Sequence, residues 1–339
     1  MLSRERVVRA LRFQHPDRAP RDLWMLPGIR MFRSAEADQV LARFPTDFTG
    51  PDARYGRGER AQGTPYVQGT YTDEWGSVWE VAETGVVGEV KHPPLADWSA
   101  LDAYRPPFEV LQHADLSRVD EGCGNTERFV LAGTLTRPFE RMQFLRGSES
   151  LLLDLGWAPA ELYRLRDMLH EFSLQEMEMW CHTAVDGISF MDDWGSMRGL
   201  LISPQTWRAF YKPLYADYTR IIHQAGKFAF FHSDGNIEAI IPDLIEIGVD
   251  ALNSQLFCMD IERIARNHRG RITFWGELDR QGTLPFGTPE VRRVRRALDT
   301  GDGGVIAEFE WGNDAPMANV LAAFEEWQRP LADIRQIEA

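Results

Sequence analysis

Five consecutive apolar segments in the second half of the chain each end in polar or ionisable residues. In chain order these residues are Asp192 and Asp193, His232 and Asp234, Asn253 and Gln255, Glu277 and Asp279, and Glu308 and Glu310. Such a set of one imidazole and several carboxylates could hold a divalent cation, because Zn²⁺ accepts histidine together with carboxylate oxygens and keeps a position open for substrate. Without a cation, a carboxylate beside His232 would make a general base that works near neutral pH.

Plainer interpretations of the same residues stay open. Strand ends are often polar because the loops that follow them are exposed to solvent. A histidine after an aromatic strand is often only a hydrogen-bonded core residue. Acids at buried strand ends, however, need partners or a cation. None of the five sets contains a cysteine, so all the candidate ligands are oxygen or nitrogen donors. Such a site could bind Mn²⁺ or Fe²⁺ as well as Zn²⁺. Cys258 follows one of the segments and is either a soft ligand or a buried, inert thiol.

The segments that carry these residues alternate with amphipathic helical stretches from about residue 128 onward. We predict strands at 129–135, 187–193, 227–234, 250–255, 271–277 and 304–310, and helices at 138–144, 159–182, 203–226, 288–301 and 316–330, with a further helix ending at 248. This alternation indicates a parallel sheet, and in a (β/α)8 TIM-type barrel the carboxyl ends of all strands lie on one face. Side chains two apart on a strand point the same way, so His232 and Asp234 would face a common opening.

The first 127 residues are less regular. Residues 19–25 could form an opening strand, whereas residues 50–110 are rich in glycine, proline and aromatic residues. We interpret residues 1–127 as an elaborated N-terminal excursion folded over one end of the barrel. No linker of the usual composition marks a boundary, so residues 1–339 are expected to form one domain, with regular βα units over 128–339.

The bulk composition excludes several classes of partner. The chain has 339 residues and a formal net charge of −14, which would repel a nucleic-acid backbone. No apolar run approaches the roughly 20 residues of a membrane span, and the N-terminal segment lacks the apolar core of a signal peptide. The three cysteines form no spaced framework, which is typical of reduced intracellular proteins. We therefore predict a cytoplasmic protein with a small-molecule substrate and without nucleic acid or membrane as a partner.

Several segments resemble the uroporphyrinogen decarboxylase superfamily. They are residues 6–11 (RVVRAL), 15–20 (HPDRAP), 231–253 (FHSDGNIEAIIPDLIEIGVDALN), 274–281 (FWGELDRQ) and 284–289 (LPFGTP). The similarity spans nearly the whole chain, and residues 231–289 carry its most specific part. It implies a distorted (β/α)8 barrel, in agreement with the alternation of strands and helices described above.

The resemblance implies one of two chemistries. The decarboxylase binds a polyanionic tetrapyrrole with paired arginines in an Arg-Gln-Ala-Gly-Arg motif, and uses no metal. The corresponding stretch here, Trp24 to Arg30, retains only Arg30, which disfavours an octacarboxylate substrate. The cobamide-linked methyltransferases hold zinc in a His-x-Cys…Cys motif. His232 matches its histidine, Asp234 stands at the first cysteine, and Glu310 falls near the second.

The methyltransferase branch therefore gives the leading functional prediction. A metal-dependent enzyme would move a methyl group between a small methoxylated or methylamine-type substrate and a corrinoid (cobalamin) on a partner protein. In the alternative function the chain is a metal-free decarboxylase or lyase, and a non-enzymatic binder is a third hypothesis. Family members are often dimers, which leaves a homodimer open. The expected site residues are the metal ligands His232, Asp234 and Glu310, the catalytic residues Glu277, Asp193 and Asn253, and the substrate-binding residues Trp24, Arg30, Tyr71, Asp73, Trp75 and Gln255.

Overall fold

A computed structural model describes residues 1–276, 278–279, 284–285 and 289–336. Its largest sheet is parallel and seven-stranded, in the order β13–β12–β11–β10–β7–β6–β2. These strands are β2 (Phe48–Thr49), β6 (Phe129–Gly133), β7 (Gly187–Met191), β10 (Phe228–Ser233), β11 (Ala251–Ser254), β12 (Thr273–Trp275) and β13 (Val305–Ile306).

A further parallel pair completes the curled sheet. Strand β1 (Trp24–Met25) pairs with β14 (Glu310–Trp311), and Arg21 forms a parallel bridge with Ala307 just beyond β13. On the other side, the Asp47 N–H donates to the Arg21 carbonyl at 2.8 Å, immediately before β2. The architecture is thus a TIM-type (β/α)8 barrel, which confirms the predicted fold class.

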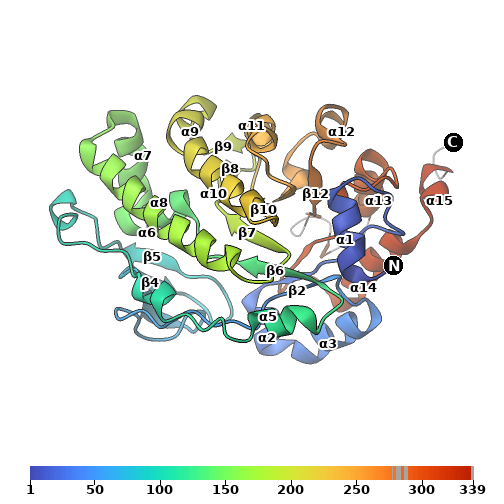
Figure 1. Cartoon of the computed structure of the whole chain (residues 1–339), viewed down its shortest axis with the longest axis horizontal. Helices are drawn as coiled ribbons and strands as arrows, with labels where there is room; N and C mark the ends of the chain where they lie inside the picture. The colour runs from blue at the N-terminus through green and yellow to red at the C-terminus, as the bar shows by residue number, and fades with distance from the viewer. Residues whose placement is uncertain (277, 280–283, 286–288, 337–339) are drawn as a thin grey trace.

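Helices cover the outer face of the barrel, and Figure 1 shows α8, α10, α11 and α12 following one another along the sheet. The helices are α1 (Ser3–Leu11), α2 (Pro27–Phe32), α3 (Ser34–Arg43), α4 (Glu109–Gln112), α5 (Val119–Gly124), α6 (Pro138–Arg146), α7 (Ser148–Trp157), α8 (Ala160–Cys181), α9 (Pro204–Phe210), α10 (Lys212–Gln224), α11 (Ile241–Glu246), α12 (Ile261–His268), α13 (Pro289–Leu298), α14 (Met317–Gln328) and α15 (Leu331–Gln336). Short 3-10 turns lie at Trp98–Ala100, Glu238–Ile240 and Leu256–Cys258. None of the helices within the described ranges is both long and apolar enough to cross a membrane.

Local sequence signals set several helix ends. The Ser203 side chain accepts from the Thr206 N–H at 3.0 Å, and Pro204 opens α9, as the sequence predicted. The predicted helix over 203–226 is in fact two helices, because Pro213 in the first turn of α10 cannot donate a backbone hydrogen bond into α9. The predicted stop at Gly226 is a left-handed residue with φ +71°.

Apolar side chains fill the barrel interior at the end where the strands begin. Inward side chains of the strands, among them Phe129, Phe230 and Trp275, form a buried cluster with Val7 and Leu11 of α1. Helix α1 therefore closes the amino end of the barrel, and the strands present their polar residues at the opposite end. A second and larger apolar cluster lies between the sheet and the outer helices.

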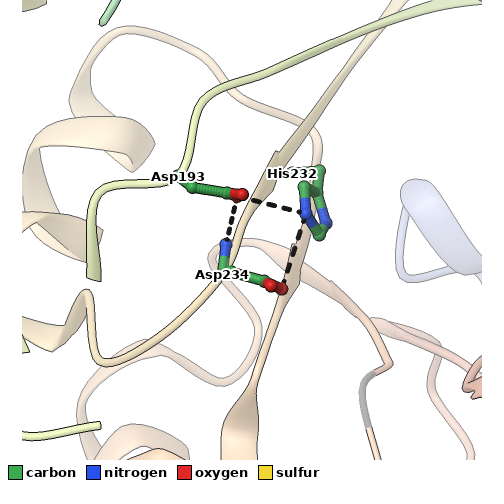
Figure 2. Close-up of side chains that lie close together, drawn as sticks. All are labelled: Asp193, His232 and Asp234. Atoms are coloured by element: carbon green, nitrogen blue, oxygen red, sulfur yellow. Dashed lines mark hydrogen bonds and ion pairs between the residues drawn. The ribbon is translucent and has the colours of Figure 1, made fainter. Parts of the chain in front are cut away.

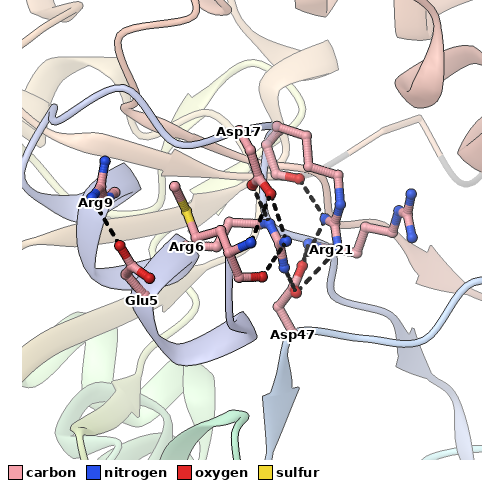
Figure 3. A network of polar contacts seen from close by, with 9 residues as sticks. Glu5, Arg6, Arg9, Asp17, Arg21 and Asp47 are labelled. Atoms are coloured by element: carbon pink, nitrogen blue, oxygen red, sulfur yellow. Dashed lines mark hydrogen bonds and ion pairs between the residues drawn. The ribbon is translucent and has the colours of Figure 1, made fainter.

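Charged residues hold α1 to the first two barrel strands (Figure 3). Asp47, which is 1% exposed, accepts from Arg6 Nη1 at 2.6 Å, from Arg18 Nη1 at 2.7 Å and from the Arg21 N–H at 2.7 Å. Arg6 also pairs with Asp17 at 2.5 Å. We call these residues (Arg6, Asp17, Arg18, Arg21 and Asp47) the amino-end network. Both carboxylates of the network are matched by arginines at hydrogen-bond distance, which suits a structural role.

The sequence alone did not reveal the barrel strand β2 or helix α7. The glycine- and proline-rich region contains an antiparallel sheet of β3 (Gly69–Thr72), β4 (Val78–Val81) and β5 (Glu89–His92), with β4 and β5 at the lower left of Figure 1. This sheet packs against α6, where Trp79 meets the Phe144 ring with centroids 4.7 Å apart and Asp73 pairs with Arg141 at 3.2 Å.

Candidate active site

One imidazole and two carboxylates meet at the carboxyl ends of β7 and β10, as Figure 2 shows. His232 lies on β10, Asp234 follows the end of that strand, and Asp193 follows β7. The Nε2 atom of His232 lies 3.4 Å from Asp193 Oδ1 and 3.6 Å from Asp234 Oδ1. One ligand atom of each residue lies within 4.8 Å of those of the other two. We call these three residues the mouth triad.

The spacing of the mouth triad suits a shared metal ion. Ligand atoms that each lie 2.0–2.2 Å from a tetrahedral Zn²⁺ are about 3.3–3.6 Å from one another. The two distances from His232 Nε2 match that separation, and they are too long for strong hydrogen bonds. An imidazole nitrogen with carboxylate oxygens is a donor set that Zn²⁺, Mn²⁺ or Fe²⁺ accepts.

Asn253 fixes which nitrogen of His232 faces the carboxylates. Its Nδ2 donates to the Trp275 carbonyl at 2.6 Å and to Glu308 Oε2 at 2.8 Å, so its Oδ1 must be the atom 2.6 Å from His232 Nδ1. That oxygen accepts the Nδ1 proton. The neutral imidazole then presents the lone pair of Nε2 to Asp193 and Asp234, which is the tautomer that metal binding needs.

The loop backbone holds the two carboxylates in place. The Asp234 N–H donates to Asp193 Oδ1 at 2.9 Å, and the Gly195 N–H donates to the Asp234 carbonyl at 3.0 Å. Gly235 has φ +77°, and a Cβ at this residue would collide with the backbone of Gly195. The two loops can therefore approach closely only because both residues are glycines.

The electrostatic environment keeps Asp193 ionised. Burial alone would raise the pKa of Asp193, but a protonated His232 lowers it below the ordinary value overall, through its hydrogen bond to this carboxylate and its charge. A metal bound at Nε2 would take the place of that proton. An ionised carboxylate is the form that binds a cation.

Glu140, near the start of α6, is a site residue that the sequence reasoning missed. Burial, followed by the charge of Asp193, raises the pKa of Glu140 to about 7. Arg137 Nη1 lies 3.7 Å from Glu140 Oε2. A carboxyl that exchanges a proton near neutral pH beside the mouth triad can serve as an acid or a base. No motif in the sequence marks Glu140; its position follows from helix packing.

The neighbouring acid Asp192 faces the opposite way from Asp193. Its carboxylate accepts from the N–H groups of Phe139 at 2.7 Å and Glu140 at 2.8 Å, and from the Tyr215 hydroxyl at 2.5 Å. Asp192 therefore caps the N-terminus of α6 and ties this helix to β7. The role is structural, and it positions Glu140.

A cavity of about 460 Å³ opens beside the mouth triad. Its lining includes Asp22, Trp24, Phe48, Met191 and Trp275, from strands around one side of the barrel, and we call it the Trp24 pocket. The Trp24 ring lies 5.0 Å from the His232 ring, centroid to centroid. Arg30 also lines the Trp24 pocket, so the structure brings both of the predicted substrate-binding residues from this stretch to one cavity.

The metal ligands predicted from sequence differ from the mouth triad by one residue. His232 and Asp234 are members, as expected, but the third member is Asp193 rather than Glu310. Asp193 had been expected to be a catalytic residue rather than a metal ligand. Glu310 lies on β14, paired in register with Trp24 of β1. Glu277 lies outside the described residues.

The other predicted site residues are more dispersed. Gln255 accepts from the Gly235 N–H at 3.0 Å and so supports the loop of Asp234. Tyr71 and Asp73 line a separate cavity of about 320 Å³ over α6. Trp75 is 2% exposed and packs against Phe172, with ring centroids 4.7 Å apart, in the core beneath that cavity. The structure does not bring Tyr71, Asp73 and Trp75 into the Trp24 pocket.

Comparisons with known proteins agree with this architecture. A family model described as "Uroporphyrinogen decarboxylase (URO-D)" matches residues 78–326. A solved structure described as "methyltransferase from Methanosarcina mazei" has a TM-score of 0.71 at 16% identity, covering 96% of this chain and 98% of that chain. At such an identity the likeness shows the fold alone.

Two sugar epimerase structures match more weakly. A 3-keto-D-glucoside 4-epimerase from E. coli has a TM-score of 0.40 at 12% identity, covering 71% of this chain and 86% of its own. A D-psicose 3-epimerase has a TM-score of 0.39 at 10% identity, covering 70% and 82% respectively. These scores are too low to support a functional argument. No curated protein sequence matches the chain.

Proposed function

The chain belongs to the uroporphyrinogen decarboxylase family, and on that premise we propose that it is a metal-dependent methyltransferase. It would move a methyl group between a small methoxylated or methylamine-type substrate and a corrinoid carried by a partner protein. The observation that carries the proposal is the mouth triad, with its two ligand separations of 3.4 and 3.6 Å from one imidazole nitrogen.

The residues of the mouth triad would hold the metal. When bound, the cation supplies Lewis acidity at the heteroatom that bears the methyl group, and the corrinoid supplies the methyl acceptor. His232 contributes Nε2 because Asn253 holds the proton on Nδ1. Asp193 and Asp234 contribute negative charge, which offsets that of a divalent ion.

Glu140 would handle the proton of the reaction. A heteroatom that loses its methyl group gains electron density and takes up a proton, and a carboxylic acid with a pKa of about 7 can give one at neutral pH. Arg137, at 3.7 Å, would then stabilise the carboxylate that remains. In this scheme the Trp24 pocket receives the substrate and its apolar walls exclude water.

Decarboxylation of a tetrapyrrole fits the Trp24 pocket less well. Such a substrate carries eight carboxylates, and its recognition needs several cations. Among the described residues that line the pocket, Arg30 is the only cationic one, whereas Asp22 adds a further acid. Incubation with uroporphyrinogen tests this alternative directly, and we expect no decarboxylated product.

The proposal is tested by metal analysis and a methyl-transfer assay. We expect about one divalent metal per wild-type chain by mass spectrometry, and a loss of metal affinity of about 100-fold or more in His232→Ala. The matched control is His223→Ala, because His223 also faces a carboxylate, Asp250 at 2.8 Å, but lies on helix α10.

Methyl transfer is then followed with free reduced cobalamin as the acceptor, using panels of methoxylated aromatic compounds and methylated amines. We expect the absorbance of methylcobalamin to rise with the wild type and the control, and not with His232→Ala. A wild-type protein that carries no metal and gains none on reconstitution would refute the metal-dependent function.

A further inference from the structure

The cavity of about 320 Å³ over α6 has no part in the proposed function, and we call it the Tyr71 pocket. It lies between α6 and the antiparallel sheet, whose strands β3 and β4 contribute Tyr71 and Trp79 to its lining. Two arginines line it from the other side. Arg137 immediately precedes α6, and Arg141 follows one helical turn later, so their guanidinium groups share one cavity.

Arg141 is a buried cation whose hydrogen bonds are incomplete. It is 8% exposed, and its guanidinium carbon lies 4.5 Å from the centre of the Trp75 ring. Its Nη1 donates to Asp73 Oδ2 at 3.2 Å, whereas its Nε has no hydrogen-bond partner among the described residues. Burial lowers the pKa of Arg141 below its ordinary value, although the charges of Asp73 and Glu74 act to raise it. The nearby acids therefore do not fully offset the cost of burying this cation.

The hydrogen-bonding capacity of Asp73 is shared among several donors. Its Oδ1 accepts from two backbone N–H groups, at 2.8 and 3.0 Å. Its Oδ2 accepts from Trp79 Nε1 at 3.0 Å in addition to Arg141. Glu74 is the other acid in the lining of the Tyr71 pocket, where it faces the charges of two arginines. A further acceptor for the remaining guanidinium donors would have to come from a ligand.

Arg137 connects the Tyr71 pocket with the mouth of the barrel. Its Nη2 donates to the thioether sulfur of Met191 at 3.0 Å, which is a weak acceptor, and its Nη1 lies 3.7 Å from Glu140 Oε2. No oxygen atom among the described residues accepts a hydrogen bond from this guanidinium group. Met191 also lines the Trp24 pocket, and Glu140 is the proposed proton donor. An anion bound to Arg137 would therefore lie close to the proposed site of methyl transfer.

We propose that the Tyr71 pocket binds the carboxylate group of a small substrate, held by the forked donors of Arg137 and Arg141. The inference rests on the proposed function and selects, from its substrate classes, a methoxylated acid. Guanidinium groups bind carboxylates through charge-assisted hydrogen bonds, often two at a time. The ether oxygen of such an acid keeps its lone pairs for the metal, whereas an alkylamine is protonated at neutral pH and has none to offer.

Tyr71 can add a neutral donor to the two cations. Burial raises the pKa of Tyr71 to about 12, so its hydroxyl group stays protonated at neutral pH. The chain as a whole carries a net charge of −14, which opposes the approach of an acid. Recognition of a single carboxylate therefore depends on local donors such as Arg137, Arg141 and Tyr71.

Calorimetric titration with two matched ligands tests the inference. The probes are 4-methoxybenzoate and 4-methoxybenzamide, which have nearly the same shape, although only the first carries a negative charge. We expect the acid to bind the wild type at least about tenfold more tightly than the amide, because only the acid forms charge-assisted hydrogen bonds with the arginines. Equal binding of the two ligands, tighter binding of the amide, or binding of neither would overturn the inference.

Variants of Arg137 separate recognition from folding. Arg137→Gln should abolish the preference for the acid while leaving the affinity for the amide unchanged. Arg137→Lys, which retains the charge but not the forked donors, should restore part of that preference. Tyr71→Phe removes only a hydroxyl group and should reduce the preference by a smaller factor. If Arg137→Gln lowers both affinities equally, Arg137 has only a structural role and the inference fails.

The matched control is Arg30→Gln, because Arg30 is the cation that lines the Trp24 pocket and pairs with Asp38 at 3.0 Å. This variant should keep the full preference for the acid. A preference that is lost in Arg30→Gln and kept in Arg137→Gln would assign the carboxylate to the Trp24 pocket and overturn the inference.

Metal content is measured on the same wild-type and variant samples. A wild type with metal but without preference for the acid refutes the carboxylate site and leaves the metal-dependent function standing. A wild type that prefers the acid but takes up no metal refutes the metal-dependent function instead. Arg137→Gln should keep its metal, because Arg137 is not a member of the mouth triad.

Discussion

The two ends of the barrel use acidic residues in opposite ways. In the amino-end network, two arginines and a backbone N–H surround Asp47, which is 1% exposed, at 2.6–2.7 Å. In the mouth triad, two carboxylates share one imidazole at 3.4 and 3.6 Å. The first arrangement satisfies its carboxylate with short charged hydrogen bonds, whereas the second places its groups at separations that would suit a common ion.

The difference suggests how an acid that stabilises the fold can be distinguished from one that is available to bind a ligand. A carboxylate that forms ion pairs with arginines at hydrogen-bond distance contributes to the stability of the fold. Removing it leaves the arginines without their partner. Carboxylates that lie around a histidine at ligand separations could instead take up a cation. Asp22 differs from Asp47, since the Leu23 N–H and Trp275 Nε1 that donate to it are neutral.

The largest effect on stability is expected from Asp47→Ala. Removing this carboxylate leaves Arg6 and Arg18 without their shared partner, which should lower the free energy of unfolding by about 3–5 kcal/mol. Urea denaturation measures the change. Asp17→Ala is the matched control in the same network, because Asp17 is 42% exposed and its removal should cost about 1 kcal/mol or less. Similar losses for both variants would contradict the structural role assigned to Asp47.

Asp22→Asn is expected to change the free energy of unfolding by a smaller amount. At neutral pH this substitution should raise the stability, whereas Asp47→Ala lowers it. Burial, which dominates its other interactions, raises the pKa of Asp22 to about 6. A raised carboxyl pKa stabilises the folded state only where the group is protonated, so this contribution is lost as the pH rises from about 4 through 6. Across that window, wild-type stability should fall relative to Asp22→Asn by up to about 3 kcal/mol. Thermal unfolding of both proteins at pH 4.5 and 7.5 measures the gap, and a constant gap would exclude a strongly shifted Asp22.

Asn253→Ala should give the smallest change in free energy of the three substitutions, and it should affect metal binding rather than folding. It leaves the mouth triad intact but frees the Nδ1 side of His232, so the ring loses its fixed tautomer. Loss of such a supporting residue lowers metal affinity by about 10- to 100-fold. Competition with a fluorescent chelator measures the affinity.

The control for Asn253→Ala is Asn319→Ala on α14, where Asn319 donates to the Leu284 carbonyl at 2.9 Å. Its metal affinity should equal that of the wild type. An unchanged affinity in Asn253→Ala would show that His232 does not need Asn253 to present Nε2.

Much of the barrel was predictable because its signals are local. The strands β6, β7, β10 and β11 begin within two residues of their predicted positions, since apolar runs bounded by glycine or polar residues define them. The last strand, predicted at 304–310, is interrupted and appears as β13 and β14. Strand β2 has two residues, too few for a periodic pattern, and it is defined by its pairing with β6.

The candidate site was predictable only in part. Alternation along β10 placed His232 and Asp234 on one face, whereas Glu310 was expected as the third metal ligand from the family resemblance alone. The structure brings Asp193, and not Glu310, into the mouth triad. Asp193 lies beyond the end of β7, where the strand period no longer applies, and the close approach of Gly195 and Gly235 brings it to His232. Glu140 comes from a helix whose position depends on the Asp192 cap.

The sequence alone determined which polar residues end the parallel strands and at which end of the barrel they gather, because strand period and chain direction are local properties. Only the tertiary structure decided which acids meet the imidazole, how Asn253 orients it, and that Asp22 lies among indole rings. Those relations join residues from different strands and loops. Their separations are set by sheet curvature and loop packing, which no single segment of the chain encodes.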